Sequence, residues 1–275
     1  MPPVTRTTIK KVNASGISDA EDVLATEEPL ELQLAFGPAG KRIQKNISVT
    51  MRTPGNDFEL AAGFLYTEGI IHAATDIVSV GYAKEDNENI VLVSLNEAVT
   101  PEINKLERNF YTTSSCGVCG KASIEAVRTA CDIPETIDQI RIAAALIYQL
   151  PGMLRKQQDI FEYTGGLHGC ALFDISGSLL LSREDVGRHN ALDKLIGAAL
   201  NKGMLPLDKH ILLLSGRASF ELVQKAIMAG IKIVAAVGAP SSLAAEMAEE
   251  WGMTLIGFLR DQRFNIYSGA ERIVI

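Results

Sequence analysis

The first part of the chain has the pattern of apolar and polar positions expected of β-strands. Four runs predict strands, the first two by partial alternation, over residues 31–36, 43–50, 77–82 and 90–95. Pro54-Gly55 breaks the second run, and Asn56 can cap a helix that continues to Ile70. The pattern therefore predicts a β-rich N-terminal region over residues 1–110.

The second part, residues 111–275, has a different pattern. A polar loop is expected at 112–115, a helix at 121–128 and a long helix over 137–150. Beyond Leu167, apolar runs with the length of buried strands alternate with amphipathic segments. The runs cover 171–175, 179–181, 211–214, 231–237 and 254–258, and the amphipathic segments cover 190–200, 220–228 and 243–251. This alternation predicts a parallel or mixed sheet covered on both faces, with the ligand site in the loops at the carboxyl ends of its strands.

Composition narrows the range of partners. The 275 residues carry a net charge of −7, and 47% of them are hydrophobic. An acidic chain is a poor general partner for nucleic acid or for an acidic membrane surface, although a local arginine cluster can still bind phosphate. No apolar run reaches the ~18 residues of a membrane span, and no secretory leader is recognisable. We therefore expect a cytoplasmic protein, in which reduced cysteines serve catalysis or metal binding.

Cys116-Gly117-Val118-Cys119-Gly120 is the strongest chemical signal in the chain. Two thiols at this spacing can share a metal, form a redox disulfide, or act as a nucleophile and its partner. The amides of the helix expected to follow, together with Lys121, favour the thiolate, which is the nucleophilic form. Cys116 and Cys119 are therefore the candidate catalytic residues.

A structural zinc site is the alternative interpretation of these cysteines. His168-Gly169-Cys170 could complete a set of four ligands. However, the H-x-C spacing is far less typical of structural zinc than a second C-x-x-C. We therefore expect no permanent metal, and we expect Cys131 to lie in the core.

Four polar or charged loops at the ends of predicted strands are candidates for binding an anionic ligand. They cover residues 164–170, 183–194, 215–219 and 257–263. Arginines bind phosphate in bidentate fashion, and helix N-termini supply further donors. The alternative for each loop is a solvated connection with internal ion pairs. The loops contain no Walker A or G-x-G-x-x-G pattern. The candidate binding residues in the first three are His168, which could also act as an acid or base, and Asp185, Arg188, His189, Ser215 and Arg217.

Several of these motifs together resemble the FdhD family of sulfurtransferases. The matching stretches are Cys-Gly-Val-Cys-Gly at 116–120, Thr-Gly-Gly-Leu-His at 164–168, Glu-Asp-Val-Gly-Arg-His-Asn-Ala-Leu-Asp-Lys at 184–194 and Ser-Gly-Arg-Ala-Ser-Phe-Glu-Leu-Val-Gln-Lys at 215–225. The N-terminal third matches more loosely, at 58–65 and 68–71. Family members often carry glycine in the segment that corresponds to Asp261-Gln262.

The resemblance implies a fold and a function. It implies a three-layer α/β/α sandwich similar to the cytidine-deaminase fold, below a β-rich N-terminal portion, and a homodimer. It implies that Cys116 accepts persulfide sulfur from a cysteine desulfurase of the IscS type. The sulfur would then pass to the molybdenum cofactor, bis(molybdopterin guanine dinucleotide), for formate dehydrogenase. The implied cofactor-binding segment consists of Phe258, Leu259, Arg260, Asp261, Gln262 and Arg263.

Three other functions stay open at this point. A zinc deaminase would share the fold class, but its H-x-E and P-C-x-x-C motifs are missing. A thioredoxin-like reductase would place its C-x-x-C at the first β-to-α junction of a small domain, whereas here the pair lies mid-chain. A non-enzymatic cofactor chaperone would keep the arginines without needing the thiols.

Overall fold

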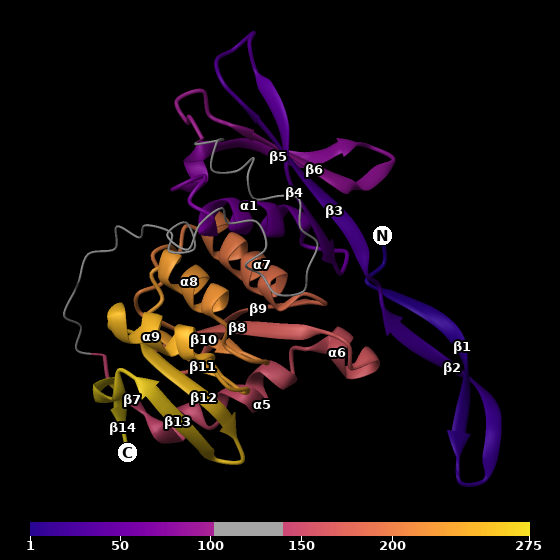
Figure 1. The fold of residues 1–275 in the computed structure, drawn as a ribbon, viewed down its shortest axis with the longest axis vertical. Coiled ribbons are helices and arrows are strands. Elements are labelled where there is room, and N and C mark those ends of the chain that lie inside the picture. The colour runs from indigo at the N-terminus through magenta and orange to yellow at the C-terminus, as the bar shows by residue number, and fades with distance from the viewer. Residues whose placement is uncertain (102–139) are drawn as a thin grey trace.

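A six-stranded mixed sheet forms the centre of the C-terminal part of the molecule (Figure 1). The computed structural model describes residues 1–101 and 140–275. The sheet has the order β13-β12-β11-β10-β8-β9. Its strands are β8 (His168–Asp174), β9 (Leu179–Asp185), β10 (His210–Leu214), β11 (Ile233–Ala236), β12 (Thr254–Arg260) and β13 (Arg263–Ser268). Strands β10, β11 and β12 are parallel, and β8 runs antiparallel to β10.

Helices cover both faces of this sheet. Successive residues of its strands point to opposite sides, so apolar side chains of one strand pack against helices on each face. On one face, Cys170 and Leu172 pack with α7 (Arg188–Asn201), α8 (Phe220–Met228) and α9 (Ser242–Glu250). On the other face, Ala171 and Phe173 pack with α4 (Ala144–Ile147) and α5 (Leu150–Arg155). The short helix α6 (Asp159–Thr164) leads directly into β8. The predicted α/β/α layering of the C-terminal part is confirmed; the likeness to the cytidine-deaminase fold stays a prediction.

A four-stranded sheet forms the predicted β-rich N-terminal portion, with the order β4-β3-β6-β5. Its elements are β3 (Glu28–Phe36), β4 (Ile43–Arg52), α1 (Asp57–Thr67), the 3-10 turn η1 (Ala74–Asp76), β5 (Ile77–Lys84) and β6 (Asn87–Leu95). Asn56 occupies the N-cap position of α1, as predicted. It adopts a left-handed conformation, however, and its side chain makes no capping hydrogen bond.

Helix α1 joins the two portions by crossing α7 at very short distance. A β-carbon on Gly63 would lie 1.9 Å from the carbonyl oxygen of Asp193, and one on Gly197 would lie 1.9 Å from that of Glu59. Two glycines therefore permit a backbone contact that no other residue allows. The expected division of the chain at residue 110 stays a prediction, since that position lies outside the described residues.

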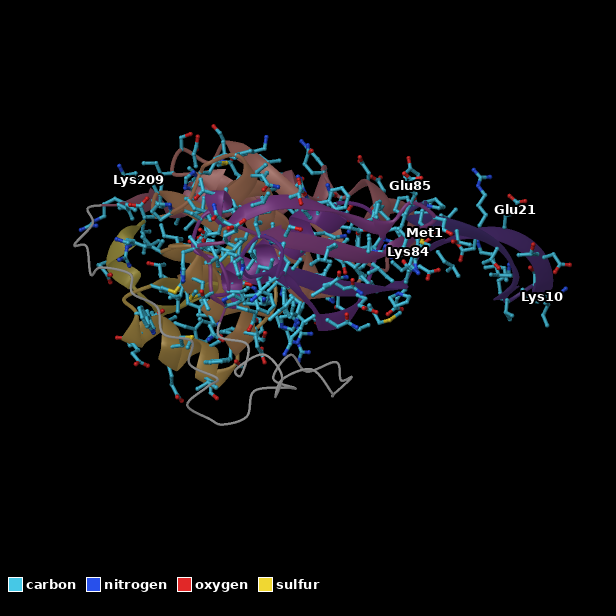
Figure 2. All side chains as sticks on the ribbon, turned by 90° about the horizontal axis from the view of Figure 1, so that it is seen from above. Met1, Lys10, Glu21, Lys84, Glu85 and Lys209 are labelled. Carbon is cyan, nitrogen blue, oxygen red and sulfur yellow. The ribbon has the colours of Figure 1, made fainter. Side chains whose placement is uncertain are left out.

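Strands β1 (Val4–Asn13) and β2 (Gly16–Ala25) form a two-stranded antiparallel ribbon that projects from the body (Figure 1). Lys10 and Glu21 mark its outer half in Figure 2. The sequence analysis did not predict this ribbon. Near its tip Val12 and Ile17 are 70% and 72% exposed, so the ribbon lacks a buried face that would set a clear pattern.

The long helix predicted over 137–150 is wrong for its described residues. Ile142–Ala143 form a short strand, β7, which pairs in parallel with β14 (Ile273–Val274) near the C-terminus, after the 3-10 turn η2 (Ala270–Arg272). Pairing with a distant strand therefore overrides the local helical preference. Two short helices then replace the single one, and Pro151 lies in the first turn of α5, where its missing N–H costs no helical bond. No helix within residues 1–101 and 140–275 is long and apolar enough to cross a membrane.

Candidate functional site

The loops predicted to bind a ligand meet at one edge of the six-stranded sheet. Pairing of His168 with Asp185 places the start of β8 beside the end of β9, and Cys170 pairs with Leu214 at the end of β10. The Gly169 N–H donates to Ser215 Oγ at 2.8 Å. Farther along the edge, the Gly238 N–H donates to the Gly216 carbonyl at 2.9 Å and the Phe258 N–H to the Gly238 carbonyl at 3.0 Å. Backbone hydrogen bonds thus connect three of the four predicted loops, those at 164–170, 215–219 and 257–263. The loop after β11 lies between the second and the third of these.

Asp185 organises the loop between β9 and α7 from a fully buried position. Its carboxylate accepts hydrogen bonds from the backbone N–H groups of Gly187 at 2.8 Å and Thr53 at 3.1 Å, and from Asn190 Nδ2 at 3.1 Å. It also forms an ion pair with Lys194 Nζ at 2.7 Å. All of these partners belong to the protein. The structure therefore gives Asp185 a positioning role, and a direct contact with a ligand stays a prediction.

The residues after Asp185 bring positive charge to the sheet edge. Arg188 is the first residue of α7, and its buried Nε has no hydrogen-bond partner among the described residues. Arg217, in the loop after β10, is exposed and has no described ion-pair partner. His189 lies 3.3 Å from Ser219 Oγ and 3.8 Å from the Glu221 carboxylate. Burial alone would raise the pKa of the Glu221 carboxyl. The hydrogen bonds that this carboxyl accepts and the nearby His189 outweigh burial and lower the pKa of Glu221 to about 2. His189 therefore turns toward α8, while the two arginines remain available for an anion.

His168 lies at the centre of this cluster. Burial lowers the pKa of its imidazole, and the positive charges of Arg188, His189 and Arg217 lower it further, against the opposite effect of Asp185. Gly216 lies against the ring: a β-carbon there would approach Nδ1 at 3.3 Å. A largely neutral imidazole offers one donor and one acceptor, so His168 can hydrogen bond to a polar ligand or exchange a proton with it.

The segment Phe258–Arg263 forms a β-hairpin, and its residues differ in accessibility. Strand β12 continues to Arg260, which pairs with Arg263 at the start of β13, so the strand extends farther than the sequence indicated. Asp261 and Gln262 form the turn with φ angles of 52° and 55°, values that glycine adopts most easily. Arg260, Asp261, Gln262 and Arg263 are exposed and accessible to a ligand, whereas Leu259 is 1% exposed in the core.

Phe258 has a strained backbone within this hairpin. Its φ is 55°, and the pairing of β12 with β13 shifts register between Gly257 and Arg260. A bulky residue at positive φ costs on the order of 1–3 kcal/mol, and such strain gathers at binding and active sites. This feature could not be deduced from the sequence, and it agrees with a binding role for the segment.

The cysteines divide between described and undescribed parts of the chain. Cys116, Cys119 and Cys131 lie outside the described residues, as do the predicted loop at 112–115 and helix at 121–128. Cys170 is buried, and its Sγ donates a hydrogen bond to the Ala191 carbonyl at 3.0 Å. Burial raises the pKa of this thiol far above its ordinary value. The zinc site considered above stays a hypothesis, because Cys116 and Cys119 lie outside the described residues.

Two parts of the site were not found from the sequence. The loop after β11, Val237–Pro240, lies between the loop at Ser215 and Phe258. Its Val-Gly-Ala-Pro-Ser-Ser sequence at 237–242 repeats the strand–glycine–serine–helix pattern of Ser215–Ser219, which was a usable signal. The buried contact of Thr53 with Asp185 had no local signal, because the two residues are far apart in the sequence.

Comparisons with known proteins identify the family. The model of the FdhD/NarQ family matches residues 25–274. The chain belongs to the FdhD/NarQ family. It is 52% identical over 259 residues to the sulfur carrier protein FdhD of Mycolicibacterium paratuberculosis, with 92% of each chain covered. It is 48% identical to that of Streptomyces coelicolor over 98% of this chain and 95% of the relative. It is 42% identical to that of Sulfolobus acidocaldarius over 96% of this chain and 98% of the relative.

A solved structure has the same fold. A crystal structure from Desulfotalea psychrophila, described as a formate dehydrogenase accessory protein, superposes with a TM-score of 0.76. The alignment covers 99% of this chain and 100% of that one, at 24% sequence identity. The family model and the curated relatives confirm the resemblance to the FdhD family that the sequence motifs indicated.

Proposed function

We propose that this protein is a cytoplasmic sulfur carrier that matures formate dehydrogenase. In this proposal Cys116 accepts persulfide sulfur from an IscS-type cysteine desulfurase. The protein would then transfer that sulfur to bis(molybdopterin guanine dinucleotide), bound as a substrate: the S–S bond breaks, Cys116 leaves as a thiolate, and the reduced metal of the substrate would supply the two electrons that convert the sulfur to sulfide. It acts as a homodimer.

The observation that carries the proposal is membership of a family whose members are named sulfur carrier protein FdhD. The geometry of the sheet edge agrees with a phosphate-bearing substrate. Arg188 and Arg217 lie close enough to His168 to lower its pKa, and both lack described ion-pair partners. Arg260 and Arg263 are exposed on the hairpin. Free guanidinium groups can bind diphosphate through bidentate hydrogen bonds.

The chemistry of loading requires only a thiolate. The Cys116 thiolate attacks the outer sulfur of the persulfide on the desulfurase. One S–S bond breaks as another forms, and the desulfurase cysteine leaves as a thiolate. The number of S–S bonds and the number of thiolates are the same before and after this exchange. Loading therefore needs no external oxidant or reductant.

Formate dehydrogenase maturation in cells tests the proposal. A strain that lacks its own sulfur carrier is supplied with the parent protein, Cys116→Ala or Cys170→Ala. We expect Cys116→Ala to abolish formate dehydrogenase activity without lowering the amount of soluble carrier. Cys170→Ala, which removes a thiol that is buried and not nucleophilic, should retain activity.

Full maturation with Cys116→Ala would refute the assignment of this thiol. If Cys119→Ala and the double variant were also fully active, the protein would instead be a non-enzymatic cofactor chaperone. That outcome would leave the role of the arginines intact and remove the sulfur-transfer step.

A further inference from the structure

A groove of about 500 Å³ opens along the outer edge of the six-stranded sheet, between β9 and the end of α5. β9 is the last strand in the order of this sheet, so one of its edges pairs with no other strand among residues 1–101 and 140–275. Leu179 packs with the core on one face of the sheet and Leu181 with the core on the other, and both line the groove. The groove therefore lies at the edge itself, and we call it the β9 groove.

The β9 groove combines apolar side chains, free backbone and a positive charge. Leu180 is 41% exposed there, and Met153 contributes a second apolar side chain. Lys156, which also lines the groove, is exposed and makes no described hydrogen bond or ion pair. At the unpaired edge of a strand, alternate backbone N–H and C=O groups point away from the sheet. Such a surface suits an extended strand that brings apolar side chains and a carboxylate.

The ribbon of β1 and β2 has the complementary character. Its tip carries Val12 and Ile17, a cross-strand pair in which both side chains are largely exposed. Glu21 lies four residues along β2 from Ile17 and hence on the same face; it projects into solvent and makes no described ion pair (Figure 2). A two-stranded ribbon is at best marginally stable in water, and its free edges are ready to pair with another strand. The ribbon thus offers the strand, the apolar side chains and the carboxylate that the groove would accept.

The ribbon does not reach the groove of its own chain. It projects from the body beside α6 (Figure 1), and its base lies at Gly166, where an added β-carbon would be 3.7 Å from that of Ala25. The start of α6 is hydrogen bonded to Glu184, near the end of β9, whereas the groove lies at the start of that strand. Ten residues in each strand give the ribbon a length of about 33 Å, against about 23 Å for the seven residues of β9. The ribbon of a second copy is therefore long enough to cover the whole edge of β9.

We propose that two copies of this chain exchange ribbons. β2 of each copy pairs with the free edge of β9 in the other, with Ile17 packed in the β9 groove and Glu21 in an ion pair with the partner's Lys156. Because each copy offers both a ribbon and a groove, the contact is made twice and closes the pair about a twofold axis. The inference rests on the homodimer of the proposed function and names the surface that forms it.

Analytical ultracentrifugation of the full-length protein over a range of concentrations tests this proposal. The variants are Ile17→Ser, Glu21→Lys, Lys156→Glu and the double variant Glu21→Lys/Lys156→Glu. Lys209→Glu is the matched control, because Lys209 is exposed and equally charged but lies neither on the ribbon nor in the groove. We expect each single variant to raise the Kd of the dimer at least about tenfold, since the lost contact occurs twice. The double variant restores opposite charges and should dimerise nearly like the parent, as should Lys209→Glu.

Two results would overturn the inference and leave the proposed function standing. If Ile17→Ser, Glu21→Lys and Lys156→Glu all dimerised like the parent, the homodimer would form through another surface. If the double variant were as weak as the single reversals, Glu21 and Lys156 would not meet.

A parent protein that stayed monomeric would refute both the inference and the homodimer, whereas sulfur loading on Cys116, measured separately, would be unaffected. If such a monomer bound the cysteine desulfurase and Lys156→Glu abolished that binding, the groove would belong to a partner protein instead of a second copy.

Discussion

Replacing Lys194 by methionine should strongly destabilise the protein, because it leaves a buried carboxylate without its counter-charge. Lys194 Nζ lies 2.7 Å from Asp185 Oδ2, and the two side chains are 2% and 0% exposed. Lys194 also donates to the Thr53 carbonyl at 2.8 Å. Methionine fills a similar volume, so the change removes charge and hydrogen bonds rather than packing.

The expected loss follows from these contacts. Removing one partner of a buried ion pair costs roughly 3–5 kcal/mol. The three donors that Asp185 keeps, from Thr53, Gly187 and Asn190, place the loss near the lower end, at about 3 kcal/mol. For a chain of this size, that corresponds to a fall in Tm of roughly 6–12 °C.

Urea and thermal denaturation followed by circular dichroism measure this loss. Lys202→Met, an exposed lysine at the end of the same helix, is the control and should change stability by at most about 0.5 kcal/mol. The double variant Asp185→Asn/Lys194→Met should be more stable than Lys194→Met, because it removes the unpaired charge. A loss below about 1 kcal/mol for Lys194→Met, or a double variant no more stable than it, would refute this account of the loop.

Three further predictions follow from other contacts. Gly197→Ala should destabilise the protein by more than about 3 kcal/mol because its β-carbon meets backbone, whereas Gly81→Ala, with open space around it, should be tolerated; denaturant midpoints compare them. Arg260→Ala or Arg263→Ala should weaken guanosine diphosphate by about 1.5–3 kcal/mol in a titration, and less at high salt; unchanged curves would place the phosphates elsewhere. His168 should titrate below the ordinary pKa of histidine in an NMR experiment. With a lowered pKa in the folded protein, His168 takes up a proton more readily in the unfolded chain. The parent should therefore lose stability relative to His168→Gln as the pH falls from about 7 to 5. A parent that gains stability relative to the variant over this range would contradict the prediction.

The sequence predicted five of the six strands of the main sheet, all except β13, and the edge where its loops meet, because buried strands and the glycine-rich turns after them have local patterns. The strand over 210–214 and the helix over 220–228 are examples. Contacts between distant segments were not predictable in this way. Asp185 was predicted as a ligand contact from its position in a charged loop, but its buried contacts with Thr53 and Lys194, which give it a positioning role, had no local signal.

Residues whose roles depend on three-dimensional packing were also missed. The burial of the Leu259 side chain in the core was not foreseen, and a contact of this residue with the cofactor through its backbone stays a prediction. Lys156 and Leu180 had no motif, and only the fold of α5 against β9 brings them to one groove. The short strand at 142–143 depended on a partner at the C-terminus, which no local pattern could reveal.

Intact-mass spectrometry after incubation with a cysteine desulfurase and cysteine tests the central claim most directly. The account predicts that the parent gains one sulfur atom, that a reductant removes it, and that peptide mapping places it on Cys116. Cys170→Ala should gain the same sulfur, and Cys116→Ala should gain none. A parent protein that gains no sulfur while the desulfurase is active, or a Cys116→Ala variant that gains as much as the parent, would contradict the account.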